Sequence, residues 1–214
     1  MLGANDGILS TASLVLGVAA SGASGAAIVT AGIAGLVAGA LSMAAGEYVS
    51  VSSQRDAEQA DIRLEDRELR RDPQGELREL AGVYEKRGLP PALASEVAVA
   101  LSRRGALAAH ARDELGLDEQ RLARPFQAAW TSALSFSAGA ALPLIAVAAT
   151  PARARVGAAV VVTLISLGVL GDLGARLGGA PRRRATARVV AWGAIAMAIT
   201  AGIGALVGTI AQIG

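Results

Sequence analysis

The sequence predicts an all-α membrane protein, with five transmembrane helices and a cytosolic helical domain inserted between helices 2 and 3. Hydrophobic residues make up 53% of the chain, Gly is frequent at 26 residues, and aromatics are only 3%. The mean hydropathy is +0.47. Small side chains let helices approach closely in lipid. The spacings Gly35-x-x-x-Gly39 and Gly204-x-x-x-Gly208 predict two such contacts.

Five apolar blocks are the candidate membrane spans. Three of them approach or exceed the roughly 20 residues that cross a bilayer core as a helix, and these are 26–51, 128–149 and 189–213. The block 7–25 is rich in Gly and Ser, and 156–171 is long enough only if its polar ends reach the interface. The chain starts without a basic stretch, so a secretory signal peptide is not expected.

The distribution of basic residues predicts the topology. Of the 20 basic residues, 13 lie between the second and third blocks, two between the third and fourth, and five between the fourth and fifth. If the N-terminus is cytosolic and the chain crosses the membrane five times, 18 basic residues lie inside and two lie outside, as the positive-inside rule requires. We therefore predict an integral membrane protein whose N-terminus and inserted domain are cytosolic, with domains 1–51, 52–125 and 126–214. The composition, rich in Arg and Ala and poor in Lys, favours a bacterial-type cell (inner) membrane.

The segment after the second block is predicted to be a cytosolic helical domain. Its core is small, so a partner copy or a bound ligand would be needed to make the domain rigid. It holds 15 of the 18 acidic residues. The second membrane helix has no breaker until Pro73 and should continue to about Arg71. Three further helices are predicted: one after Pro73, one from about Pro91 to Arg104, and a short one from Ala106 to Gly116.

Several function classes are disfavoured. The chain has no Cys, so it has neither disulfides nor thiolate metal sites. It has a single His and no Gly-rich phosphate loop. An intramembrane hydrolase using Asp6 and Glu47 lacks a nucleophile or a metal-activating His at the same depth. We expect no enzymatic activity, no prosthetic group and no nucleic-acid partner.

Three acids lie in or beside the apolar blocks: Asp6, Glu47 and Asp172. An ionisable group at bilayer depth costs about 2.5–3.5 kcal/mol on insertion scales and is a functional candidate. If the first two helices turn near 21–25, Asp6 lies roughly 22 Å from the turn and Met43 roughly 27 Å, at 1.5 Å per residue. Glu47 lies one helical turn beyond Met43. These three side chains should therefore cluster near the cytosolic half of one helix pair.

Two carboxylates and a thioether suit a borderline cation such as Fe²⁺ or Mn²⁺ better than Mg²⁺ or Ca²⁺. Such carboxylates can also exchange protons for metal. Simpler interpretations stay open. Glu47 could be hydrated or paired with Arg55, Asp6 could cap its helix, Met43 could be packing, and Asp172 could pair with Arg176.

The inserted segment carries a second acidic pattern. Asp61, Glu65, Glu68 and Asp72 follow one another at spacings of four, three and four, and so share one helix face. Glu76 and Glu79 begin the next helix. Clustered like charges repel unless they are neutralised. A divalent cation would do this, and so would the interleaved arginines (Arg63, Arg67, Arg70, Arg71, Arg78). His110 by itself is typical of a surface or packing histidine.

The stretches "NDGILSTASLVLGVAASG" and "TAGIAGLVAGALSMAAGEYVSVSSQRD", with the later "DELGLD", resemble the vacuolar iron transporter family, the proton-coupled Fe²⁺/Mn²⁺ exporters of plants, yeasts and many bacteria. The resemblance covers essentially the whole chain. It implies a homodimer of five-helix subunits, each with a cytosolic metal-binding domain after the second helix.

The resemblance also implies roles for residues. Asp6 and Met43 fall in the translocation path, whereas a pathway Glu of the plant members is replaced by Gly35, and Glu47 is suggested to take over part of its role. The metal-binding glutamates of the family fall on Glu65, Glu68, Glu76, Glu79 and Glu114. His110 stands where plant members have a Met, and it is a competent ligand for Fe²⁺, Mn²⁺ or Zn²⁺.

The leading hypothesis is a dimeric, proton-coupled exporter that binds cytosolic Fe²⁺ or Mn²⁺, with Zn²⁺ and Co²⁺ as further candidates for the cytosolic domain. Its expected partners are the lipid bilayer, divalent metal ions, protons and a second copy. The alternative is a membrane-anchored sensor or buffer of metal that transports nothing.

Overall fold

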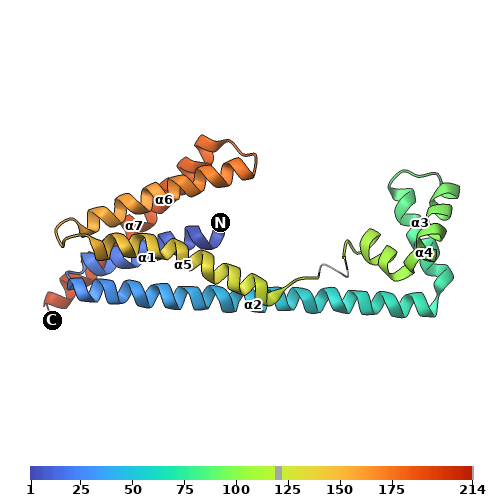
Figure 1. The fold of residues 1–214 in the computed structure, drawn as a ribbon, viewed down its shortest axis with the longest axis horizontal. Helices are drawn as coiled ribbons and strands as arrows, with labels where there is room; N and C mark the ends of the chain where they lie inside the picture. Colours follow the sequence, from blue (N-terminus) through green and yellow to red (C-terminus); the bar gives the residue numbers. More distant parts are fainter. Residues whose placement is uncertain (119–121, 214) are drawn as a thin grey trace. The chain divides into compact units, whose positions relative to one another are not determined.

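The computed structural model describes residues 1–118 and 122–213, which form helices connected by short turns (Figure 1). The contacts divide the chain into two compact units, Met1–Glu47 with Gln127–Gly214, and Tyr48–Phe126. The helices are α1 (Leu2–Ala20), α2 (Gly25–Arg71), α3 (Pro73–Lys86), α4 (Pro91–Asp113), α5 (Pro125–Ala149), α6 (Arg155–Leu177) and α7 (Arg182–Ile213).

Five of the described helices, α1, α2, α5, α6 and α7, are long and apolar enough to cross a membrane. This agrees with the number of predicted spans. Several of these helices are longer than their apolar blocks. α6 has 23 residues because it continues past 171 through a polar turn. α2 has 47 residues, or about 70 Å, whereas a bilayer core is about 30 Å thick. Only the first half of α2 is therefore apolar enough to be the span, and the predicted continuation to Arg71 is confirmed.

The first two helices form the predicted hairpin. α1 ends at Ala20, and the turn uses Gly22 at φ 82, a left-handed conformation that favours glycine. The hydroxyl of Ser24 accepts a hydrogen bond from the N–H of Ala27 at 3.2 Å, which caps the first turn of α2. This short connection brings α1 and the first part of α2 side by side within the first unit (Figure 1).

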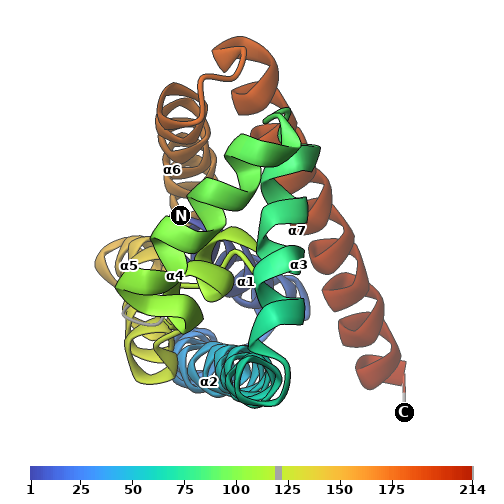
Figure 2. The ribbon, with the colours of Figure 1, turned by 90° about the vertical axis from the view of Figure 1, so that its right-hand side faces the viewer.

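α1 is the central helix of the first unit, and its apolar window is 44% buried against 11–28% for the other four spans. Ala12, Val15 and Leu16 of α1 form one core cluster with residues from each of the other spans, namely Ile28, Val147, Ala159 and Met197. In the end-on view α1 lies among α5, α6 and α7 (Figure 2). A side chain on α1 is therefore enclosed by its neighbours.

Glycines set how closely these helices approach. A Cβ added at Gly204 would collide with the backbone of Gly17, and one at Gly208 with the backbone of Ser21. The close packing that the Gly204-x-x-x-Gly208 spacing predicted is therefore confirmed, and α7 packs directly on α1. A Cβ at Gly39 would meet the Phe136 ring instead.

We expect Gly204→Ala to destabilise the first unit by about 1–3 kcal/mol, because backbone atoms cannot move aside and the two helices must separate. The measurement is the thermal unfolding midpoint of the detergent-solubilised protein. Gly202→Ala is the matched control on the same helix, since no atom lies within 4 Å of an added Cβ there. Equal midpoints for the two variants would contradict the contact.

The second unit combines the charged part of α2 with α3 and α4. Asp72 caps α3 by accepting a hydrogen bond from the N–H of Gly75 at 2.8 Å, with Pro73 at the first helical position. Leu80, Ala81, Ala98 and Ala109 form its small core, and Leu77, Tyr84 and Leu101 pack against them. The helix break predicted between 104 and 106 appears as a kink at Gly105 inside α4.

Candidate functional site

The second unit gathers carboxylates around one histidine. The His110 side chain is fully buried, and its Nδ1 lies 2.8 Å from Glu65 Oε1, 3.0 Å from Glu114 Oε2 and 3.9 Å from Glu76 Oε2. Glu65 comes from α2, Glu76 from α3, and Glu114 from the C-terminal cap of α4. We call these four residues the glutamate–histidine cluster.

One imidazole nitrogen cannot satisfy this many acceptors. A ring nitrogen carries at most one proton, and the contact of Nδ1 with Glu114 has hydrogen-bond geometry. Within the described residues, the buried Glu65 Oε1 and His110 Nε2 have no hydrogen-bond partner. Buried polar atoms without partners are rare and call for an explanation. A divalent cation supplies one, because it binds several donor atoms at once.

The carboxyl groups of the cluster resist losing their protons. Burial raises the pKa of Glu65 to about 7, with further repulsion from Glu114, Glu76 and Glu68 and with His110 acting in the opposite direction. Burial also raises the pKa of Glu76, and repulsion from Glu79 adds to it. Burial is also the main reason that the pKa of Glu114 is raised. A cation would relieve this repulsion and lower all three pKa values.

The donor set suits a transition metal. Glu65, Glu76 and His110 each offer one ligand atom, and these atoms lie within 4.8 Å of one another. Carboxylate oxygen with imidazole nitrogen fits Fe²⁺, Mn²⁺ or Zn²⁺. Glu68 and Glu79 are exposed at the rim, near enough to raise the pKa values of cluster carboxyls. The structure thus gathers all six predicted metal-binding residues in one region, four of them in the cluster.

The interleaved arginines do not neutralise the cluster. Among the described ion pairs, Arg70 is the one member of this set with a partner, and that partner is Asp66, at 2.7 Å on the same helix. Asp66 is not part of the cluster. The salt-bridged surface that the sequence left open as an alternative therefore does not account for the buried carboxylates.

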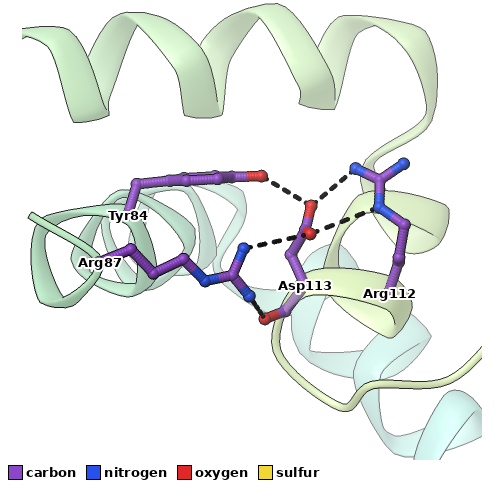
Figure 3. Close-up of polar contacts among 4 residues, drawn as sticks. All are labelled: Tyr84, Arg87, Arg112 and Asp113. Atoms are coloured by element: carbon purple, nitrogen blue, oxygen red, sulfur yellow. Dashed lines mark hydrogen bonds and ion pairs between the residues drawn. The ribbon is translucent and has the colours of Figure 1, made fainter. Parts of the chain in front are cut away.

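A polar clamp holds the end of α4 against α3 (Figure 3). The Asp113 carboxylate accepts hydrogen bonds from the Tyr84 hydroxyl at 2.6 Å and from Arg112 Nη2 at 2.7 Å, and Arg87 Nη2 donates to the Asp113 carbonyl oxygen at 2.6 Å. The hydrogen bond from Arg112 is the main reason that the pKa of Asp113 falls to about 2. The clamp fixes the helix end that carries His110 and Glu114. No sequence pattern indicated the clamp, because Asp113 belongs to no periodic arrangement of acids.

We expect Asp113→Asn to loosen this helix end, because hydrogen bonds to a charged group contribute about 1.5–3 kcal/mol. Amides of residues 110–114 should exchange with solvent roughly 10-fold faster or more, since local opening energies set the exchange rates. Hydrogen–deuterium exchange with mass spectrometry measures this on the full chain. Glu96→Gln, an exposed carboxylate near the start of α4, is the control. Unchanged exchange in Asp113→Asn would contradict the clamp.

In the first unit, Asp6 and Met43 line the same cavity. Asp6 lies in the second turn of α1, so it does not cap that helix, and Met43 lies on α2. The cavity measures about 220 Å³, and its other polar lining comes from Ser10, Thr11 and Ser42. A second cavity of about 500 Å³ is also lined by Asp6 and Met43, together with Asn5 and Arg188 among others. The structure therefore brings these two side chains to the same cavities.

Two oxygen atoms at these cavities lack hydrogen-bond partners within the described residues. They are Thr11 Oγ1 and Asn5 Oδ1, and both atoms are buried. A buried polar atom without a partner is costly among membrane helices. Together with a carboxylate and a thioether, these oxygens make a lining suited to water or a cation. No sequence pattern indicated these two residues, because Thr and Asn are common in membrane helices.

Glu47 and Gly35 differ in their relation to this site. Glu47 is exposed and lines neither cavity. Gly35 lines the smaller cavity, and a Cβ there would meet only the tip of the Leu14 side chain. Removing a side chain at position 35 leaves room beside Asp6 and Met43.

Asp172 has the ion pair predicted as its simpler role. Its carboxylate lies 2.8 Å from Arg176 Nε, and Arg182 binds it in bidentate fashion at 2.6 and 3.0 Å. These contacts join α6 to α7. Asp172 lies with Arg182 and is not among the residues that line the two cavities of Asp6.

Comparisons with known proteins identify the family of the chain. The model of the VIT family matches residues 1–205. The chain is 46% identical over 207 residues to a vacuolar iron transporter of Acanthamoeba castellanii, covering 96% of this chain and 76% of that protein. It is 41% identical to vacuolar iron transporter homolog 5 of Oryza sativa (95% and 76% covered) and 38% identical to homolog 2 of Arabidopsis thaliana (97% and 82% covered). On this match over nearly its whole length, the chain belongs to the VIT family.

Proposed function

We propose that this protein transports a divalent transition metal, Fe²⁺ or Mn²⁺, across the membrane and exports it from the cytosol in exchange for protons. The observation that carries the proposal is the cavity shared by Asp6 and Met43 among helices long enough to span a bilayer. A carboxylate exposed to a cavity at membrane depth is costly unless it serves an ion or a proton. The relatives named iron transporters support the same conclusion.

The glutamate–histidine cluster is the proposed capture site. It belongs to the second unit, which we place in the cytosol because 18 of the 20 basic residues then lie on the cytosolic side. Its carboxylates and imidazole must lose protons to bind metal, so metal binding at this site releases protons. Zn²⁺ and Co²⁺ fit the same donor atoms. Metal capture from the cytosol therefore accounts for the second unit, which a transport path through the membrane would not by itself need.

Asp6 and Met43 form the proposed path, and Glu47 acts at its approach. Glu47 lies one helical turn from Met43 on α2, exposed, where it can attract a cation without enclosing it. The Met43 thioether favours a softer cation than Mg²⁺ or Ca²⁺. Asp6 exchanges a proton for the metal, because a cation favours the carboxylate form.

A homodimer is the proposed assembly. The apolar windows of α2 and α7 are only 11% and 17% buried within one chain, which leaves apolar surface for lipid or for a second copy. Crosslinking of the protein in native membranes, followed by denaturing electrophoresis, tests this directly. Detection of the monomer alone after crosslinking would contradict the dimer.

Proteoliposomes test the transport function. Purified protein is reconstituted, an inward or outward pH gradient is imposed, and entry of Fe²⁺ or Mn²⁺ is followed with a metal-sensitive dye inside the vesicles. We expect flux that depends on the direction of the pH gradient and is absent from empty vesicles. Metal binding without any flux would refute the transporter and favour the sensor or buffer. Flux that ignores the pH gradient would refute the proton exchange alone.

A further inference from the structure

A cavity lies where α6 meets α7, and Asp6, Met43 and Glu47 are not among the residues that line it. It measures about 1200 Å³ and is lined by Asp172, Arg182, Arg183, Arg184 and Thr186, with Ala180, Pro181, Ala187 and Val190 as its apolar part. α6 and α7 pack closely beside it, since a Cβ at Gly171 would lie 3.0 Å from Thr186 Cα. The two helices therefore form most of the wall of the cavity, and Ala180 and Pro181 of the connection between them complete it.

The charges in this cavity are unbalanced. Asp172 is its one acid, and that carboxylate already binds Arg182 and Arg176. Arg183 and Arg184 have no ion pair or hydrogen bond within the described residues. Both lie in the first turn of α7, where the positive end of the helix dipole disfavours cations. The two guanidinium groups repel each other and are repelled by the helix dipole. An anion bound between them would offset both repulsions.

The apolar part of the lining indicates which anion fits. Val190 lines the cavity, and α7 continues from there into an apolar span in which Trp192, Ile195 and Ile199 are exposed. On α6, the exposed Leu173 directly follows Asp172, which also lines the cavity. Trp is typical of the interface between headgroups and acyl chains. A molecule with its phosphate on the arginines would lay its hydrocarbon on this surface. Basic pockets between membrane helices bind anionic headgroups in this manner.

We propose that Arg183 and Arg184 form a binding site for the headgroup of an anionic phospholipid. Asp172 acts through Arg182: it neutralises that guanidinium and ties it to α6, so the two arginines that follow remain free for the phosphate. The site is independent of the proposed transport function, because Arg183 and Arg184 line neither cavity of Asp6.

Fluorescence of Trp192 tests the proposal in bilayers. The background variant Trp130→Phe leaves Trp192 as the one tryptophan of the chain. The protein is reconstituted in phosphatidylcholine containing a fixed fraction of either brominated phosphatidylglycerol or brominated phosphatidylcholine, and quenching is compared. We expect stronger quenching by the anionic lipid. The preference should fall about fivefold for each arginine replaced in Arg183→Gln and Arg183→Gln/Arg184→Gln, at about 1 kcal/mol per basic residue.

Arg153→Gln is the matched control, because it removes the same charge from an exposed position in the connection between α5 and α6. It should leave the preference unchanged. Arg176, Arg182 and Arg188 remain in every variant, so the charge bias that orients the helices is retained. Equal quenching by the two lipids in the parent protein would overturn the proposal, as would a preference that survives the double substitution. Loss of the preference on adding inorganic phosphate at constant ionic strength would identify a soluble anion as the occupant and overturn the lipid.

Discussion

Glu65→Gln is expected to lower the affinity of the full-length protein for Mn²⁺ by roughly 100-fold or more, because it removes a buried ligand that must be ionised to bind. Glu65 Oε1 lies 2.8 Å from the fully buried His110 and belongs to the set of three donors within 4.8 Å. Isothermal titration calorimetry on detergent-solubilised protein measures the change. Glu85→Gln, an exposed carboxylate on α3, is the matched control and should bind as the parent does.

The same variant should not lose stability without metal. Burial and neighbouring carboxylates raise the pKa of Glu65 to about 7. A raised carboxyl pKa stabilises the fold at low pH, and this contribution is lost as the pH rises from about 4.5 through about 7. A neutral Gln avoids that loss, so at pH 8 the metal-free variant should unfold at the same temperature as the parent or higher. The rise in unfolding temperature that Mn²⁺ causes in the parent should disappear.

The Mn²⁺ affinity and the unfolding temperature without metal together show whether Glu65 is a metal ligand or a residue needed only for the fold. A variant that bound Mn²⁺ weakly because its fold was damaged would unfold at a lower temperature without metal. Retained Mn²⁺ affinity in Glu65→Gln would contradict the glutamate–histidine cluster as the capture site. Glu68→Gln should have a smaller effect than Glu65→Gln, because Glu68 is exposed at the rim.

Asp6→Asn is expected to reduce Mn²⁺ flux in proteoliposomes by about 100-fold or more while leaving metal binding at the cluster unchanged. The amide has nearly the size of the carboxylate but can neither neutralise a cation nor carry a proton through the membrane. Asp6 lines both cavities that Met43 lines. Flux is measured with the same dye assay, and binding by calorimetry on the same preparation.

Glu47→Gln is the informative comparison. Glu47 is exposed and lines neither cavity, so its loss should lower flux only severalfold, through a weaker attraction of cations at the approach. A loss as large as that of Asp6→Asn would place Glu47 inside the path. Retained flux in the double variant Asp6→Asn/Glu47→Gln would refute the path altogether.

Local patterns were sufficient to predict most helices. Pro73 predicted where α2 ends, and the two spaced glycines predicted the contact of α7 with α1, because breakers and small residues act at their own position. The depth of Asp6 and Met43 followed from counting residues along a hairpin whose turn the sequence revealed. α6 extends beyond the apolar block 156–171, because the polar turn around Asp172, which is neutralised by Arg176 and Arg182, continues as helix.

The sequence by itself determined that five apolar helices alternate with polar connections and that the acids concentrate in one segment, since hydropathy and charge are properties of local composition. Only the tertiary structure decided which acids matter together. Spacing along one helix treats Glu65 and Glu68 alike, yet packing of α3 and α4 buries Glu65 against His110 and leaves Glu68 at the surface. Burial and convergence depend on residues distant in the chain, so the site follows from packing and not from the order of residues.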